Sequence, residues 1–113
     1  MQFARNILIA SIVVVCGTAI SADKQAGMAL SATCVACHGQ DGNSVVPGTP
    51  HLAGQNSRYL KRQMELIQSG TRPVPLMTGM LDGLNEQGLA DIAAYYASLP
   101  ASIREASRDR LEQ

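Results

Sequence analysis

Three residues around position 36 carry the clearest chemistry in the sequence. Cys34 and Cys37 are separated by two residues, and His38 follows the second cysteine directly. Two thiols at this spacing can add to the vinyl groups along one edge of a haem, and the adjacent imidazole can turn under the iron and coordinate it. The pattern therefore predicts one haem of the c type, covalently attached, with His38 as an axial ligand.

Two other interpretations of the same residues are weaker. A thioredoxin-type redox pair has the same cysteine spacing, but it requires a preceding strand and a βαβ unit, and the sequence shows neither. A structural zinc site requires four ligands, and the candidates are Cys34, Cys37, His38 and His51. The adjacency of His38 to Cys37 makes a tetrahedral arrangement difficult, so haem attachment is favoured over both.

A haem iron with one histidine ligand has an open face, and a thioether is the expected second ligand in an electron carrier. Beyond Met1 the chain has four methionines. Met28 and Met64 lie in helical patterns and are expected to fill the core. Met77 and Met80 lie in a proline-bounded loop, which can present a side chain across the ring from the cysteines. The second ligand is therefore expected from this loop.

The elements that must position these residues are helical. Apolar residues recur at helical spacing in the segments 23–35, 57–70 and 86–99, with Ser57 and Asn85 as expected cap residues. No apolar run with a period of two indicates a strand. The sequence predicts an all-α fold with three main helices, the first of which delivers the cysteine motif.

Two long connections separate these helices. Residues 39–55 are dense in glycine and proline, and residues 71–84 contain two prolines within three positions. Connections of this length in a small domain usually fold around something. We expect both loops to wrap the cofactor.

Composition excludes other classes of protein. The chain has 113 residues, enough for one domain, and nine Lys and Arg balance nine Asp and Glu, so no nucleic-acid partner is indicated. Cys34 and Cys37 are too close in sequence to staple distant parts of a domain. The core is expected to be thin in aromatic residues, with Tyr96 the tyrosine that faces it.

Residues 1–22 resemble an export signal. Arg5 is followed by an apolar run over 7–15 and by small residues up to Ala22, which predicts a mature chain that starts at Asp23 in the periplasm. The apolar run is shorter than the roughly 20 residues that a membrane-spanning helix needs. We expect a signal peptide over 1–22, a haem domain over 23–100 and a polar C-terminal tail over 101–113, without a membrane span in the mature form.

Several motifs together resemble the class I c-type cytochromes, and in particular one half of the tandem di-haem periplasmic cytochromes of the c-four group. They occupy residues 34–39, 41–44, 52–55, 58–60, 77–80 and 89–96. The resemblance implies the cytochrome c fold around the haem. This chain has one attachment motif where those proteins have two, so one haem per chain is expected.

The resemblance also implies roles for individual residues. The ligating methionine of the family directly precedes Thr-Gly, which is Met77 here, and Met80 is the second candidate, expected to pack near the ring. Arg58 and Tyr59 are expected to hydrogen-bond a haem propionate, or else to be a solvated arginine and a packed tyrosine. Pro47 is expected to fix the carbonyl that accepts the His38 ring proton. His51 could be a second haem ligand, but because Met77 fits the family position it is expected to be a surface or propionate-facing imidazole.

Iron that is capped on both faces cannot receive a substrate. The sequence therefore predicts a one-electron carrier rather than an enzyme, with redox donor and acceptor proteins as partners. A five-coordinate haem enzyme and a haem subunit of a larger dehydrogenase or sulfur-oxidising complex remain as alternatives. In the second case the tail over 101–113 would dock the partner.

Overall fold

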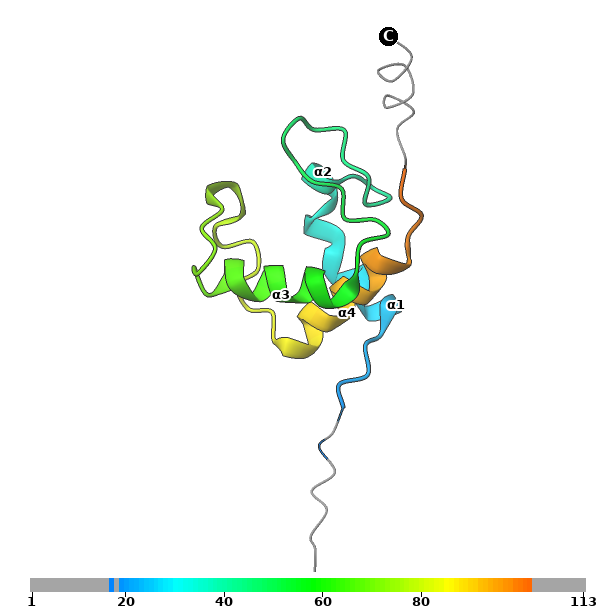
Figure 1. The fold of residues 1–113 in the computed structure, drawn as a ribbon, viewed down its shortest axis with the longest axis vertical. Coiled ribbons are helices and arrows are strands. Elements are labelled where there is room, and N and C mark those ends of the chain that lie inside the picture. Colours follow the sequence, from blue (N-terminus) through cyan, green and yellow to red (C-terminus); the bar gives the residue numbers. More distant parts are fainter. Residues whose placement is uncertain (1–16, 18, 103–113) are drawn as a thin grey trace, which may run out of the picture.

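The computed structural model describes residues 17 and 19–102, and in this part of the chain every regular element is helical. The elements are α1 (Lys24–Leu30), η1 (Ser31–Thr33), α2 (Val35–His38), α3 (Ser57–Gln68), η2 (Pro75–Met77) and α4 (Glu86–Ser98) (Figure 1). The predicted all-α class is confirmed. Most of the predicted signal peptide and the tail beyond residue 102 lie outside the described residues.

The arm that carries the cysteines is three short helical pieces rather than the one helix expected over 23–35. The Asp23 carboxylate caps α1 by accepting hydrogen bonds from the backbone N–H groups of Gln25 and Ala26. A 3₁₀ turn follows, and Leu30 and Cys34 at its two ends keep right-handed helical angles. The tighter turn changes the helical period, so that Cys34 begins a new turn, α2, instead of ending the first helix.

The arm is fixed to α4 by a close approach of the two backbones. A β-carbon on Gly27 would lie 2.0 Å from the carbonyl oxygen of Asp91, so no side chain fits at this position. Figure 1 shows α1 lying against α4. Gly27 therefore determines how the cysteine-bearing arm is seated on α4.

The core lies where α3 packs across α4. Its buried members are Leu60 of α3 and Ile92, Ala93 and Tyr96 of α4, with Met64 packed against them. Tyr96 is 2% exposed, which confirms its predicted place in the core. The expectation for Met28 was wrong: its side chain is 47% exposed, because the face of α1 that meets α4 is the one that carries Gly27.

Asparagine side chains cap the two longer helices. The Asn85 side chain accepts a hydrogen bond of 2.8 Å from the Gly88 N–H, as expected at the start of α4. At α3 the cap is Asn56, whose side chain accepts from the Tyr59 N–H at 3.1 Å, rather than the predicted Ser57. Ser57 is instead the first helical residue, a shift of one position at a helix end.

The two long loops project from the same side of α3 in the view of Figure 1, and α2 lies with the first of them. Residues 39–55 contain turns and bends only, and residues 71–84 contain the short 3₁₀ turn η2. Among the described residues, no helix has both the length and the apolar character needed to cross a membrane. The fold thus places both loops where they can enclose a group held by α2.

Candidate functional site

The cysteine motif forms a single helical turn. The His38 N–H donates to the Cys34 carbonyl at 2.9 Å, which closes α2, and neither Cys34 nor Cys37 is in a disulfide. Cys37 is exposed, while Cys34 is half-buried against the core and its pKa is raised by that burial. Residues three apart share a face of a helix, so both sulfurs are available to one ligand edge.

His38 is held in one orientation by the backbone. Its side chain is 7% exposed, and Nδ1 lies 2.9 Å from the carbonyl oxygen of Pro50. A carbonyl oxygen can only accept, so Nδ1 carries the ring hydrogen and Nε2 keeps its lone pair. This is the arrangement that a metal-ligating histidine requires, with the non-ligating nitrogen bonded to a carbonyl.

The partner of His38 differs from the sequence prediction, which assigned the carbonyl to Pro47. Pro47 is exposed and lies within a turn closed by a hydrogen bond of 3.1 Å from the Thr49 N–H to the Val46 carbonyl. That turn reverses the chain, and it is the next proline, Pro50, that reaches the imidazole. The prediction for Pro47 was therefore wrong by three positions.

Ser44 ties the first loop to the cysteine turn, and the sequence analysis missed it. Its hydroxyl is buried and donates to the Cys37 carbonyl at 2.7 Å, so it occupies one of the free carbonyls at the end of α2. Gly39 makes the sharp exit from this helix with φ of +88°, and a β-carbon there would lie 2.3 Å from the Asn43 carbonyl oxygen. The sequence carried a signal for this helix end, because glycine commonly follows the last residue of a helix, but it carried none for the Ser44 contact.

Tyr96 presents a buried hydroxyl that makes no hydrogen bond of normal geometry among the described residues, although the side chains of Ser31 and Cys34 lie near it. Burial, and secondly the nearby Cys34, raise the pKa of Tyr96 to about 12. A buried polar atom without a hydrogen bond is unfavourable and calls for an explanation. Its place beside Cys34, at the point where a haem would join the polypeptide, fits a site that is completed by the cofactor.

The second loop holds the two candidate methionines differently. Met77 is half-buried and lines a hollow of about 430 Å³ together with Pro73, Pro75 and Thr78. Met80 is 46% exposed. The loop is fastened to α3 by one side chain that the sequence analysis did not single out: Gln68 Nε2 donates to the carbonyls of Leu81 at 2.7 Å and Leu84 at 2.8 Å.

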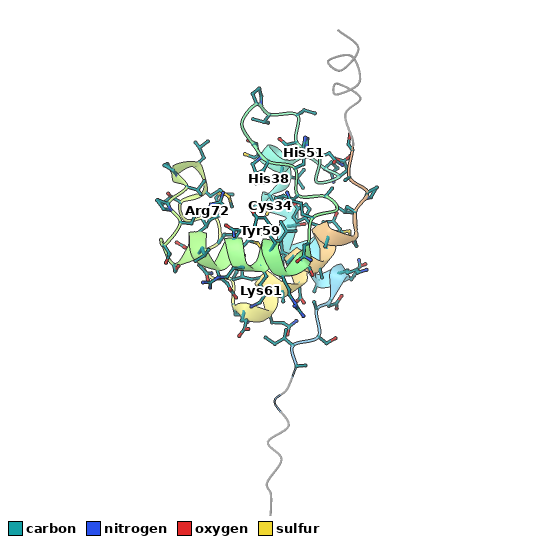
Figure 2. All side chains as sticks on the ribbon, in the orientation of Figure 1. Cys34, His38, His51, Tyr59, Lys61 and Arg72 are labelled. Carbon is teal, nitrogen blue, oxygen red and sulfur yellow. The ribbon has the colours of Figure 1, made fainter. Side chains whose placement is uncertain are left out.

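The remaining predicted site residues lie at the surface. Arg58 and His51 are exposed, and Tyr59 is 52% exposed. Figure 2 shows Tyr59 on α3 between Cys34 on one side and Arg72 of the second loop on the other. The position of Tyr59 is compatible with a contact to the cofactor, whereas the expected propionate contacts of Arg58 and His51 stay predictions.

The residues present fit a covalently attached haem. The donor set comprises two free thiols on one face of a turn and an imidazole with an available Nε2, and two methionines lie in the loop beyond α3. Apolar side chains on both loops and on α3 are left exposed, which suits a site that a planar apolar macrocycle would cover in part; they are Val45, Val46, Tyr59, Leu76 and Met80.

Comparisons with known proteins agree with this geometry. Residues 24–100 match the family model of cytochrome c. The chain is 52% identical over 91 residues to cytochrome c4 of Pseudomonas aeruginosa, covering 80% of this chain and 45% of that protein. It is 44% identical over 79 residues to cytochrome c-554(548) of Halomonas halodenitrificans, covering 67% of this chain and 95% of that protein.

A solved structure gives the same result. The crystal structure of reduced recombinant cytochrome c4 from Pseudomonas stutzeri matches with a TM-score of 0.71 and 47% identity, covering 74% of this chain and 48% of that chain. The chain thus spans about half the length of the cytochrome c4 proteins that it matches. This confirms the predicted resemblance to one half of the tandem di-haem proteins of the c-four group.

Proposed function

The chain belongs to the cytochrome c family and binds haem c, and from this we propose that it is an exported single-haem carrier of one electron at a time. It would exchange electrons with redox donor and acceptor proteins in the periplasm, and it would not act as an enzyme. Its fold and its similarity to cytochromes over most of the described chain support this proposal.

Four residues are assigned to the cofactor. Cys34 and Cys37 would hold it through thioether bonds, His38 would supply Nε2 as one iron ligand, and Met77 would supply its sulfur as the second, with Met80 as the second candidate. Bound haem supplies a one-electron couple between ferric and ferrous iron. Tyr59 would pack at the edge of the site, and Arg58 would lie at the surface near a propionate.

The observation that carries the proposal is the hydrogen bond of 2.9 Å between His38 Nδ1 and the Pro50 carbonyl. It fixes the tautomer and the ring orientation and raises the basicity of Nε2, as second-sphere partners of metal-bound histidines do. A redox-active dithiol would not need this contact. A half-buried Met77 in the loop beyond α3 would then close the remaining position and leave none for a substrate.

The test is a redox titration combined with exposure of the reduced protein to carbon monoxide. A carrier with both axial positions filled should titrate as one electron and bind carbon monoxide slowly or not at all. Rapid binding would indicate an open iron position and would favour a haem enzyme instead. Haem that remains on the polypeptide after acid denaturation and solvent extraction confirms covalent attachment, and recovery in a periplasmic fraction checks export.

A further inference from the structure

A buried carboxylate of α4, which meets the backbone at the start of α1, is not accounted for by the proposed function. Asp91 lies in the middle of α4 and is 5% exposed. It accepts a hydrogen bond of 2.7 Å from the backbone nitrogen of Asp23 and one of 2.8 Å from Gln87 Nε2. In the described part of the chain, no lysine, arginine or histidine nitrogen pairs with it within 4.0 Å.

This arrangement is unfavourable as long as Asp23 N is an ordinary peptide nitrogen. Buried carboxylates are normally paired with a cation, because removal of the charge from water costs free energy that neutral donors recover only in part. Asp91 has neutral donors alone. The nitrogen closest to it is, however, the one that a cut between Ala22 and Asp23 would turn into a free amine.

We propose that hydrolysis of the Ala22–Asp23 peptide bond completes the fold, because the new α-ammonium group of Asp23 forms an ion pair with the buried Asp91 carboxylate. Water adds across the bond, so that the carbonyl carbon of Ala22 becomes a carboxylate and the Asp23 nitrogen becomes an ammonium group. A leader peptidase of the exporting cell would catalyse the step. The proposal deepens the export assigned above and rests on it.

The surroundings of Asp23 favour a charged nitrogen at this point. A positive charge at the start of a helix is normally unfavourable, because that end of the helix dipole is itself positive. Here the Asp23 carboxylate caps α1 and the Asp91 carboxylate lies 2.7 Å from the nitrogen, so two negative groups surround one positive group.

The position of the pair is set by the backbone rather than by flexible side chains. Gly27 brings α1 against the carbonyl of Asp91, and the Gly27 N–H donates to the Asp23 carbonyl at 2.9 Å. Asp23 is thereby held one turn from the contact. Among the described hydrogen bonds nearby, the cut would remove only that from Gln87 Nε2 to the Ser21 carbonyl, at 2.9 Å. Gln87 would keep its bond to Asp91.

The first test is the intact mass of the haem-loaded protein, expressed as the full chain and purified from the periplasm. The expected first residue is Asp23. A first residue at any other position overturns the proposal but leaves the electron-carrier function standing, since the redox titration and carbon monoxide test are independent of it.

The second test compares two backgrounds by denaturant unfolding of the haem-loaded protein. One is the natural chain, and the other has Gly-Ser inserted between Ala22 and Asp23, with a mass that shows the two residues retained. The insertion keeps Asp23 N as a peptide nitrogen. Charge-assisted hydrogen bonds are stronger than neutral ones, so Asp91→Asn should reduce the folding equilibrium constant roughly tenfold more in the natural chain.

A matched control is Asp82→Asn, which removes an exposed carboxylate and should have the same small effect in both backgrounds. An equal loss for Asp91→Asn in the two backgrounds would overturn the ion pair. If Asp91→Asn does not fold, the insertion alone decides. With Asp91 intact, the folding equilibrium constant of the inserted chain should be roughly tenfold lower than that of the natural chain. Equal constants contradict the proposal.

Discussion

The two regions that would face opposite sides of the haem are built differently. The histidine side, residues 34–55, is tied together by bonds to buried groups: Pro50 accepts from His38, Ser44 bonds Cys37, and Gly42 accepts from the N–H groups of residues 52 and 53. The methionine loop, residues 71–84, encloses a hollow of about 430 Å³, and its Leu76 is 92% exposed.

This difference indicates a division of labour. The polypeptide alone orients the ligand on the histidine side. The methionine loop is held by local turns, by the bonds of Arg72 to Gln63 and Leu66 at its start, and by the amide of Gln68. We therefore expect coordination by Met77 to supply part of the order of that loop. Changes to the histidine side should affect the stability of the whole domain, and changes to the methionine loop should affect coordination first.

The largest loss of stability is expected from Gly27→Ala, which displaces the arm that carries the histidine side. The new β-carbon would overlap the Asp91 carbonyl, and overpacking of this kind costs about 3 kcal/mol or more. Chemical denaturation of the haem-loaded protein measures it. Gly88→Ala is the matched control, because its β-carbon would meet ordinary contacts at 3.4 Å or more, and its unfolding free energy should stay within about 1 kcal/mol of wild type.

Met77→Ala should come next, and its main effect is on coordination. Loss of a half-buried methionine in the loop should lower the free energy of unfolding by about 2 kcal/mol. The weak red absorption of the sulfur–iron bond in the oxidised protein should disappear, and the potential should fall by about 0.1 V or more, within the roughly 0.8 V range set by axial ligands.

Met80→Ala separates ligation from packing, since it removes an equal side chain from the same loop. The red band and the potential should remain close to those of wild type. If Met80→Ala abolishes the band and Met77→Ala preserves it, the assignment of the sixth ligand is wrong, although the contrast between the two regions stands.

The histidine side was also the more predictable region from sequence. Its chemistry is local: Cys34, Cys37 and His38 lie within five positions, and any helical turn brings the two thiols to one face. The helix over 86–98 was equally clear, because Asn85 and Pro100 mark its ends. Such features depend on neighbours in sequence, which is what pattern analysis can see.

Contacts between distant residues could not be obtained in this way. Which proline carbonyl meets His38 depends on the path of a 17-residue loop, and a turn at Pro47 shifts the contact to Pro50. Met28 has a helical spacing suited to the core, but the direction of its face depends on the close approach of Gly27 to Asp91. Gln68 lies in an ordinary polar position of α3, and only the folded loop gives its amide a role.

Gln68→Ala should sharpen the comparison by loosening the methionine loop without removing a candidate ligand. Two hydrogen bonds to backbone carbonyls would be lost, with an expected cost of about 1 to 2 kcal/mol. The red absorption band should bleach at a lower denaturant concentration than the helical circular dichroism signal. Coincident loss of both signals would contradict the view that the loop is ordered separately. Gln25→Ala, which replaces an exposed glutamine of α1 far from this loop in sequence, is the control.

The smallest effect is expected from Glu65→Gln, which lies outside both regions. Lys61 of α3 pairs with Glu65 and also reaches Glu86 of α4 at 3.2 Å. The hydrogen bond from Lys61 keeps the pKa of Glu65 below its usual value. A carboxyl with a lowered folded pKa stabilises the protein above its unfolded pKa, and that contribution is lost as the pH falls through the folded pKa.

Wild type should therefore exceed Glu65→Gln slightly in free energy of unfolding at pH 7 and converge with it in acid below the ordinary carboxyl range. Added salt should also reduce the difference, because the pair is exposed to solvent. Unfolding curves at two pH values and two salt concentrations measure this. Since α3 and α4 support both loops, the red band and the potential should not change. A loss of the band would mean that the surface charges set the geometry of the methionine loop, and the contrast with the histidine side would then rest on electrostatics rather than on backbone contacts.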